Sequence, residues 1–233
     1  MSDIAHQLPA PRLHALIPSA GTGSRAGTAI PKQYQSVAGQ PLVRHTLAAF
    51  AAVPRIATVL LCVAPGDRTL AGEPGVTVVE CGGPTRAATV AGGLRELRAR
   101  GAAESDWVLV HDAARCLITP ALIDRLIDAC LDDEVGGLLA QPVADTLKHG
   151  PAGRVEATLP REGHWLAQTP QMFRLGVLAR ALEAAGAAVT DEAAAIESLG
   201  LKAKLVPGSA RNFKVTWPDD FALAEAILQR NTP

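Results

Sequence analysis

Short, almost continuous apolar runs alternate along this chain with longer segments of helical periodicity. Residues 56–63 and 107–111 are apolar at nearly every position, which is typical of strands covered on both faces. Residues 41–52 carry apolar side chains three and four positions apart, after a proline that suits a first helical turn. This β–α–β alternation predicts a mostly parallel sheet with helices on both faces. The predicted strands are 13–18, 56–63, 76–79, 107–111, 137–141 and 203–206, and the predicted helices are 41–52, 85–99, 120–131, 175–185, 191–198 and 218–229.

The alternation is interrupted between residues 142 and 169. This segment is polar, contains a Gly-Pro-Ala-Gly turn at 150–153, and resembles two strands joined by a hairpin that projects from the body. The chain shows no internal repeat, low-complexity linker or domain boundary. We therefore predict one domain over residues 1–233, with a Rossmann-like three-layer α/β fold and a projecting β-arm at about 142–169.

Composition restricts the class of partner. The 233 residues are 48% hydrophobic and 19% charged, with a net charge of −1 and no basic block, so neither nucleic acid nor a membrane surface is a predicted partner. No apolar stretch reaches ~20 residues, the length of a spanning helix, and the N-terminus lacks a signal-peptide pattern. The scattered cysteines form no C-x-x-C pair, so no zinc site or redox dithiol is predicted. We expect a cytoplasmic protein.

A small-residue loop follows the first predicted strand. The apolar run stops at Pro18, and the loop then carries Gly21, Gly23 and two cations, Arg25 and Lys32. Glycine lets backbone N–H groups come close to a ligand, and such a loop can form a concave array of donors for phosphate oxygens. Donors and fixed cations together stabilise charge on a phosphoryl group. The sequence therefore predicts a triphosphate-binding loop.

Two other phosphate-binding loops compete with this interpretation. Gly21, Gly23 and Ala26 fit the G-x-G-x-x-A dinucleotide fingerprint, which favours a nicotinamide-dependent enzyme. However, Pro31 follows too soon for the long helix that this fingerprint opens, and the second predicted strand ends without the expected acidic residue. A Walker-type loop does not fit, because no Gly-Lys-Ser/Thr follows the glycines. We rank the nicotinamide enzyme third among the possible functions.

Several motifs in register carry a family resemblance. The loop P-S-A-G-x-G-x-R, followed by P-K-Q, resembles the signature of nucleotidyltransferases that move a nucleoside monophosphate onto a sugar or polyol phosphate. Further motifs between about residues 13 and 229 are similar to the 2-C-methyl-D-erythritol 4-phosphate cytidylyltransferase family of the non-mevalonate isoprenoid pathway. The chain departs from the family pattern at Pro84, Ala88 and Cys116. The matching motifs are VHDAAR at 110–115, PVADT at 142–146, TPQMF at 169–173, TDEAAAIE at 190–197 and NFKVTWPDD at 212–220.

The resemblance implies attack by a phosphate oxygen on the α-phosphorus of CTP, with pyrophosphate leaving. Because the attacking phosphate is already ionised near pH 7, no general base is required, and we assign His111 a structural role. Positioning and charge stabilisation then lower the barrier, and the Thr89 hydroxyl and backbone groups are expected to recognise cytosine. The residues implied in nucleotide binding are Ser19, Ala20, Gly21, Gly23, Arg25, Lys32, Gly83 and Thr89. Those implied in catalysis are Arg25, Lys32, Arg161 and Lys214.

The polyol phosphate and a metal ion are expected beside Asp112, which follows a buried strand at the edge where open α/β sheets bind ligands. A carboxylate there can hold Mg²⁺ together with phosphate oxygens, so Asp112 is the implied metal ligand. In the family the arm hooks onto a second subunit and completes its site, which implies a homodimer through residues 142–169. The residues implied in binding the polyol phosphate are Asp112, Arg115, Thr146, Arg161, Thr169, Thr190 and Lys214.

Two alternative functions stay open beside this one. Ribitol 5-phosphate cytidylyltransferases have a nearly identical loop signature, although the run TDEAAAIE favours the methylerythritol enzyme. A catalytically silent nucleotide-binding protein can share the fold, but a silent relative has no physical need for Arg25, Lys32, Asp112, Arg161 and Lys214 together. We predict a cytidylyltransferase that makes 4-diphosphocytidyl-2-C-methyl-D-erythritol.

Overall fold

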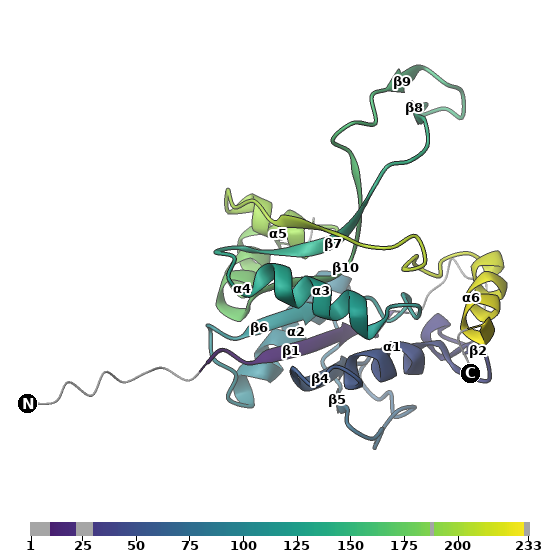
Figure 1. Cartoon of the computed structure of the whole chain (residues 1–233). Coiled ribbons are helices and arrows are strands. Elements are labelled where there is room, and N and C mark those ends of the chain that lie inside the picture. Colours follow the sequence, from purple (N-terminus) through teal and green to yellow (C-terminus); the bar gives the residue numbers. More distant parts are fainter. Residues whose placement is uncertain (1–9, 22–29, 187–188, 231–233) are drawn as a thin grey trace, which may run out of the picture.

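A seven-stranded sheet in the order β11-β7-β10-β6-β1-β4-β5 forms the centre of the molecule (Figure 1). The computed structural model describes residues 10–21, 30–186 and 189–230. Neighbouring strands are parallel except β10, which runs antiparallel to both β6 and β7. The predicted mostly parallel α/β sheet is therefore confirmed. The strands are β1 Leu13–Pro18, β4 Ile56–Cys62, β5 Thr77–Val79, β6 Trp107–Val110, β7 Gly136–Pro142, β10 Trp165–Arg174 and β11 Lys204–Pro207.

Helices cover both faces of the sheet and complete three layers. In β1, Ala15 and Ile17 face the core shared with α1 and α3, whereas Leu16 faces the core shared with α2, α4 and α5. Successive side chains of a strand point to opposite faces, so an unbroken apolar strand supplies two cores at once. No described helix is long and apolar enough to cross a membrane. The helices are α1 Leu42–Ala51, α2 Arg86–Ala99, α3 Pro120–Cys130, α4 Leu175–Ala185, α5 Glu192–Ser198 and α6 Pro218–Arg230.

Local sequence explains where the two helices nearest the candidate site begin. The Thr85 side chain accepts a hydrogen bond from a first-turn N–H of α2, and Asp191 does the same for α5. Such caps satisfy amide groups that the start of a helix leaves without partners. They place Arg86 and Glu192 as the first helical residues of α2 and α5.

The arm leaves the body between β7 and β10 and ends in a two-stranded ladder of β8 (Leu147–His149) and β9 (Ala157–Leu159) (Figure 1). The predicted segment 142–169 also contains the first half of β10, a strand that the sequence analysis did not predict. Gln168 and Thr169 are buried in the body. The pattern did not indicate this strand because its buried positions include polar side chains, whose partners lie far away in the sequence.

α6 closes the end of the molecule that holds the candidate site. It packs on a third apolar cluster that includes Val37, Leu42, Leu117 and Val215. The backbone N–H of Val215 also donates to the Ala114 carbonyl at 2.9 Å. This packing holds the segment before α6 against the loop after β6. Three short elements that were not predicted complete the fold: η2 Lys32–Tyr34, β2 Ser36–Val37 and β3 Gln40–Pro41.

Candidate active site

A cavity of about 680 Å³ opens where the carboxyl ends of β1 and β6 meet the first turn of α2. Open α/β sheets bind ligands at this edge, and the volume lies in the usual range for small-molecule sites. A neighbouring cavity of about 170 Å³ shares Arg86, Asp112, Thr190 and Lys214 with it. Predicted site residues that line the larger cavity are Ser19, Ala20, Gly21, Lys32, Gly83, Thr89, Asp112, Thr190 and Lys214.

The side chain of Gln33 holds the start of the loop that follows β1. Its side-chain Nε2 donates to the carbonyls of Ser19 at 2.9 Å and Gly21 at 3.0 Å. Beside it, Lys32 Nζ donates to the Val215 carbonyl at 2.6 Å, which joins this loop to the segment before α6. Gln33 belongs to the motif P-K-Q, but no role was predicted for it. The predicted residues Gly23 and Arg25 lie outside the described residues.

The second turn is shaped by Thr89, which is buried. Its hydroxyl donates to the Thr85 carbonyl at 3.0 Å and accepts a hydrogen bond from the Gly83 N–H at 3.1 Å. A Cβ on Gly82 would lie 2.4 Å from the Ala20 Cβ, so glycine lets the two turns touch. The Thr89 hydroxyl therefore donates its proton within the turn and offers a ligand only a hydrogen-bond acceptor.

Three cations converge on Asp112. Its Oδ1 accepts a hydrogen bond from Arg86 Nε at 2.8 Å, its Oδ2 lies 2.8 Å from Lys214 Nζ, and Arg115 Nε lies 3.8 Å from Oδ2. Burial disfavours the charged carboxylate, but the charges of Arg86 and Lys214 outweigh burial and hold the pKa of Asp112 well below its usual range. The group is an anion throughout the physiological range, and its two oxygens have different cationic partners.

Arg86 also binds a second carboxylate, that of Glu192. Its Nη1 and Nη2 donate to the two Glu192 oxygens at 2.5 and 3.0 Å, in the bidentate geometry that a guanidinium favours. Glu192 is 1% exposed. Glu192 belongs to the motif TDEAAAIE, but its contact with Arg86 was not predicted.

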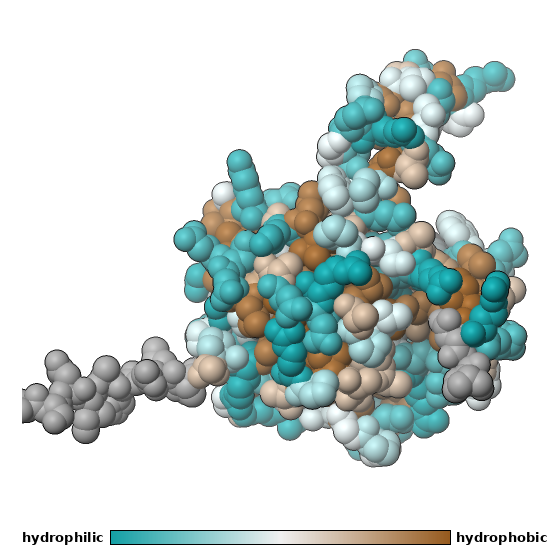
Figure 2. All heavy atoms as spheres, in the orientation of Figure 1, coloured by the Kyte–Doolittle hydropathy of each residue, from teal (hydrophilic) through white to brown (hydrophobic). Residues whose placement is uncertain are grey.

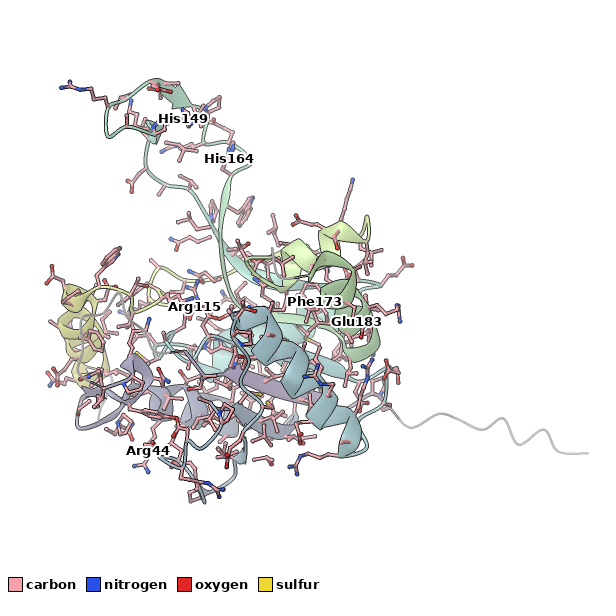
Figure 3. The ribbon with its side chains drawn as sticks, turned by 180° about the vertical axis from the view of Figure 1, so that it is seen from behind. Arg44, Arg115, His149, His164, Phe173 and Glu183 are labelled. Carbon is pink, nitrogen blue, oxygen red and sulfur yellow. The ribbon has the colours of Figure 1, made fainter. Side chains whose placement is uncertain are left out.

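Arg115 lies between the C-terminal segment and the base of the arm (Figure 3). Its Nη1 donates to the Asn212 carbonyl at 2.7 Å and its Nη2 to the Ala167 carbonyl at 3.3 Å. Its Nε is buried and has no hydrogen-bond partner among the described residues. In the described structure Arg115 therefore supports the walls of the smaller cavity, and only its Nε stays available toward Asp112.

Thr169 and His111 form a hydrogen-bonded chain beneath Asp112. The Asp112 N–H donates to Thr169 Oγ1 at 3.0 Å, and that hydroxyl lies 3.0 Å from His111 Nδ1. His111 Nε2 lies 3.2 Å from the Arg115 carbonyl, which can only accept. The proton of neutral His111 is therefore on Nε2, and Thr169 donates to Nδ1. Burial lowers the pKa of His111 to about 3, which fits the structural role assigned to it.

Two predicted residues on the arm are not brought to these cavities. Thr146 and Arg161 are exposed, and the Arg161 guanidinium donates to the Ala144 carbonyl. Neither lines the cavities found in the described part of this chain. The body therefore gathers most of the predicted site, whereas the arm carries its two residues away from it.

The described residues contain no group of three or more acidic, histidine or cysteine side chains that could hold a metal ion. Among the described residues that line the larger cavity, Asp112 is the single acidic one. Mg²⁺ is commonly bound by one or two carboxylates plus substrate phosphates and water. The donor set therefore fits an ion that arrives on a triphosphate, but not an ion held by protein carboxylates alone.

Comparison with known proteins identifies the family. The family model for 2-C-methyl-D-erythritol 4-phosphate cytidylyltransferase (IspD) matches residues 13–230. A bifunctional enzyme IspD/IspF of Albidiferax ferrireducens is 64% identical over 94% of this chain and 53% of its own length, so this chain spans about half of that relative. The 2-C-methyl-D-erythritol 4-phosphate cytidylyltransferase of Bordetella petrii is 58% identical over 93% of this chain and 98% of its own length.

The structural comparison agrees with the sequence comparison. A crystal structure of 4-diphosphocytidyl-2C-methyl-D-erythritol synthase matches with a TM-score of 0.83 and 41% identity, and the match covers 94% of this chain and 98% of that one. Together with the family match over nearly all described residues, this likeness confirms the predicted resemblance. The chain belongs to the 2-C-methyl-D-erythritol 4-phosphate cytidylyltransferase family.

Proposed function

We propose that this chain transfers CMP from CTP to 2-C-methyl-D-erythritol 4-phosphate, releasing pyrophosphate and forming 4-diphosphocytidyl-2-C-methyl-D-erythritol. The observation that carries the proposal is the convergence of Arg86, Lys214 and Arg115 on Asp112 beside a cavity of about 680 Å³. In this cluster Lys214 would offer fixed positive charge to the substrate phosphates, while Arg86 and Arg115 hold Asp112 and the walls of the cleft. Membership of the family identifies the substrates and favours this reaction over ribitol phosphate transfer or silent nucleotide binding.

We assign to Lys32 and Lys214, together with Arg25, the role of neutralising the negative charge of the substrate phosphates. In the described structure the two amines are held by the Val215 carbonyl at 2.6 Å and the Asp112 carboxylate at 2.8 Å. Both lysines line the larger cavity. Phosphate oxygens are acceptors of comparable or greater strength, so exchanging partners on substrate binding costs little. The amines then stabilise the negative charge that builds up as the acceptor oxygen attacks the α-phosphorus.

Thr89 supports selection of cytosine over uracil. Because its hydroxyl proton is donated to the Thr85 carbonyl, the oxygen can only accept a further hydrogen bond. Cytosine presents an amino donor at position 4, where uracil presents a carbonyl acceptor. The buried Thr89 oxygen therefore favours CTP, whose amino group can donate to it. With UTP it would face the carbonyl oxygen at position 4, and two acceptors cannot form a hydrogen bond.

A Mg²⁺ ion is proposed to enter with the triphosphate. Asp112 Oδ2 is the protein oxygen that would hold it, with the remaining ligands from phosphate and water. When bound, such an ion neutralises charge on the phosphates. Since Lys214 lies 2.8 Å from the same oxygen, the amine and the ion compete for it.

We propose a homodimer in which the arm of one subunit completes the site of the other. Thr146 and Arg161 are exposed and lie away from the cavities of their own chain. Hydrophobic residues also lie on the surface of the projecting arm (Figure 2). The exposed large apolar side chains of the arm and its base include Val155 at 66% and Leu166 at 58%. A thin two-stranded ladder has little stability alone, so burial against a partner would account for both features.

A cytoplasmic location is part of the same proposal. All four cysteines are free thiols, as is usual in a reducing compartment. Both proposed substrates are highly charged phosphates, which the cytoplasm supplies without a transport step. Activity in a cytoplasmic extract, and none in a membrane fraction of the same cells, is the expected result.

The test is pyrophosphate release with CTP, Mg²⁺ and 2-C-methyl-D-erythritol 4-phosphate. Release that requires both substrates supports the proposal, and ATP, GTP and UTP should give much less. Faster release with ribitol 5-phosphate would keep the chemistry but replace the acceptor. No release with any pair would leave a nucleotide-binding protein without this activity.

A further inference from the structure

Arg86 and Glu192 form a buried ion pair that has no direct part in the proposed reaction. Glu192 is 1% exposed, and the Arg86 side chain is 26% exposed. The guanidinium spends Nη1 and Nη2 on Glu192 and Nε on Asp112, so each of its nitrogens already donates to a carboxylate. Arg86 is therefore poorly placed to bind a substrate phosphate. Burying this bidentate Arg–Glu pair, called the fork below, costs desolvation free energy. A functional role for the fork would therefore depend on its geometry.

The geometry of this contact determines which oxygen of Asp112 faces the cleft. Arg86 holds Oδ1 at 2.8 Å, and Oδ2 remains toward Lys214 at 2.8 Å. Without the Arg86 hydrogen bond, the carboxylate could rotate about its terminal torsion, which is soft. Glu192 in turn fixes the guanidinium, because a bidentate pair sets both its plane and its position.

The same contact joins the two sides of the proposed active site. Arg86 directly follows the turn that contains Gly83 and Thr85, and Glu192 lies two residues after Thr190. Arg86 and Glu192 are 106 positions apart in the sequence. A buried fork between the first turns of α2 and α5 therefore sets the distance between the nucleotide side and the polyol side of the cleft.

We propose that Arg86 and Glu192 are positioning residues for the transfer reaction: their buried fork orients Asp112 so that Oδ2 meets Lys214 at the proposed phosphate site. This inference rests on the proposed function. The pair acts through Asp112 and touches no reacting atom. Losing the pair should lower kcat, because misplacing charge-stabilising groups by a fraction of an ångström weakens transition-state stabilisation.

The test separates positioning from stability with methionine variants. Arg86→Met alone leaves the buried Glu192 carboxylate without its partner and removes one of the cations around Asp112, so we expect Tm to fall on the order of 10 °C. The double variant Arg86→Met/Glu192→Met removes the unpaired charge of Glu192 as well, so most of the Tm should return. Its kcat should still be reduced roughly 10- to 100-fold, the usual cost of losing a second layer of support at a site.

A second cycle tests whether the pair acts through Asp112. In an Asp112→Asn background, adding the double methionine change should lower kcat by less than about twofold. The carboxylate that the pair would orient is then already absent, and the effects of substitutions in one network do not add. The matched control is Arg98→Met/Glu104→Met, which removes an Arg–Glu fork with 2.7 Å contacts, formed by a residue near the other end of α2. The control should leave kcat unchanged. Glu192→Gln, which keeps the length of the side chain, is the milder variant if Arg86→Met does not fold.

Two results would overturn the inference. If the double variant regained both Tm and kcat, the fork would be structural only. If its effect on kcat were the same in the Asp112→Asn background as in the wild type, the pair would act independently of Asp112. A wild-type chain without turnover on CTP and 2-C-methyl-D-erythritol 4-phosphate would instead refute the proposed function, so the two failures are distinguishable.

Discussion

Lowering the pH from 7 to 5 should destabilise this protein through one residue, His111. Its ring is fully buried, packs on Phe50 with centroids 5.2 Å apart, and has both nitrogens placed for a neutral tautomer. Protonation would put a second N–H against Thr169, whose own proton already points there. Burial therefore lowers the pKa of His111 to about 3, whereas an unfolded chain keeps an ordinary value near 6.5.

The sign follows from proton counting. Between pH 6.5 and 3 the unfolded chain binds a proton at His111 and the folded chain does not, so stability falls as the pH falls through this window. Integrating this one proton from pH 7 to pH 5 gives a loss of about 2 kcal/mol in the free energy of unfolding. Carboxylates with lowered pKa, such as Asp112 and Asp106, lose their contribution mainly below pH 5.

The assay is urea unfolding at pH 7 and pH 5 for the wild type and for His111→Gln. Glutamine can keep the hydrogen bond to the Arg115 carbonyl but has no titrating ring. The variant should be less stable at pH 7 and should lose about 2 kcal/mol less than the wild type on acidification. An equal loss in both proteins would refute the argument, since His111 would then titrate alike in the folded and unfolded states.

Three further predictions concern the cleft and the arm. Lys32→Ala should lower turnover in the pyrophosphate assay roughly 100-fold or more with an unchanged circular dichroism spectrum; near-normal turnover would remove Lys32 from the charge-stabilising set. Mixing Lys32→Ala chains with Arg161→Ala chains should restore about a quarter of the activity under random pairing, because one site in each mixed dimer keeps both side chains. Verified heterodimers without recovery would refute the shared site. Gly82→Ala should raise the Kd for CTP, because the new Cβ would lie 2.4 Å from the Ala20 Cβ and 2.7 Å from the Val63 carbonyl oxygen; calorimetric titration with CTP measures this Kd, and an unchanged value would show that the two turns can separate freely.

Local patterns predicted most of the elements because each is decided by neighbouring residues. The apolar run at 13–18 became β1 with the predicted bounds, and the helix predicted at 85–99 starts one residue later because Thr85 is its cap. The strand β10 was missed. Its polar residues look suited to a loop, yet Gln171 is buried, where it donates to Asp191 and accepts from the Ala193 N–H.

The candidate site divides in the same way. Residue type and local spacing indicated the phosphate loop with its cations and placed Asp112 at the edge of the sheet. Lys214 was assigned to the site only through the family resemblance. Which side chains meet was decided only by the tertiary structure. Lys214 reaches Asp112 across 102 positions, and Lys32 reaches Val215 across 183. Such contacts depend on strand order and on packing between layers, and no local pattern contains either.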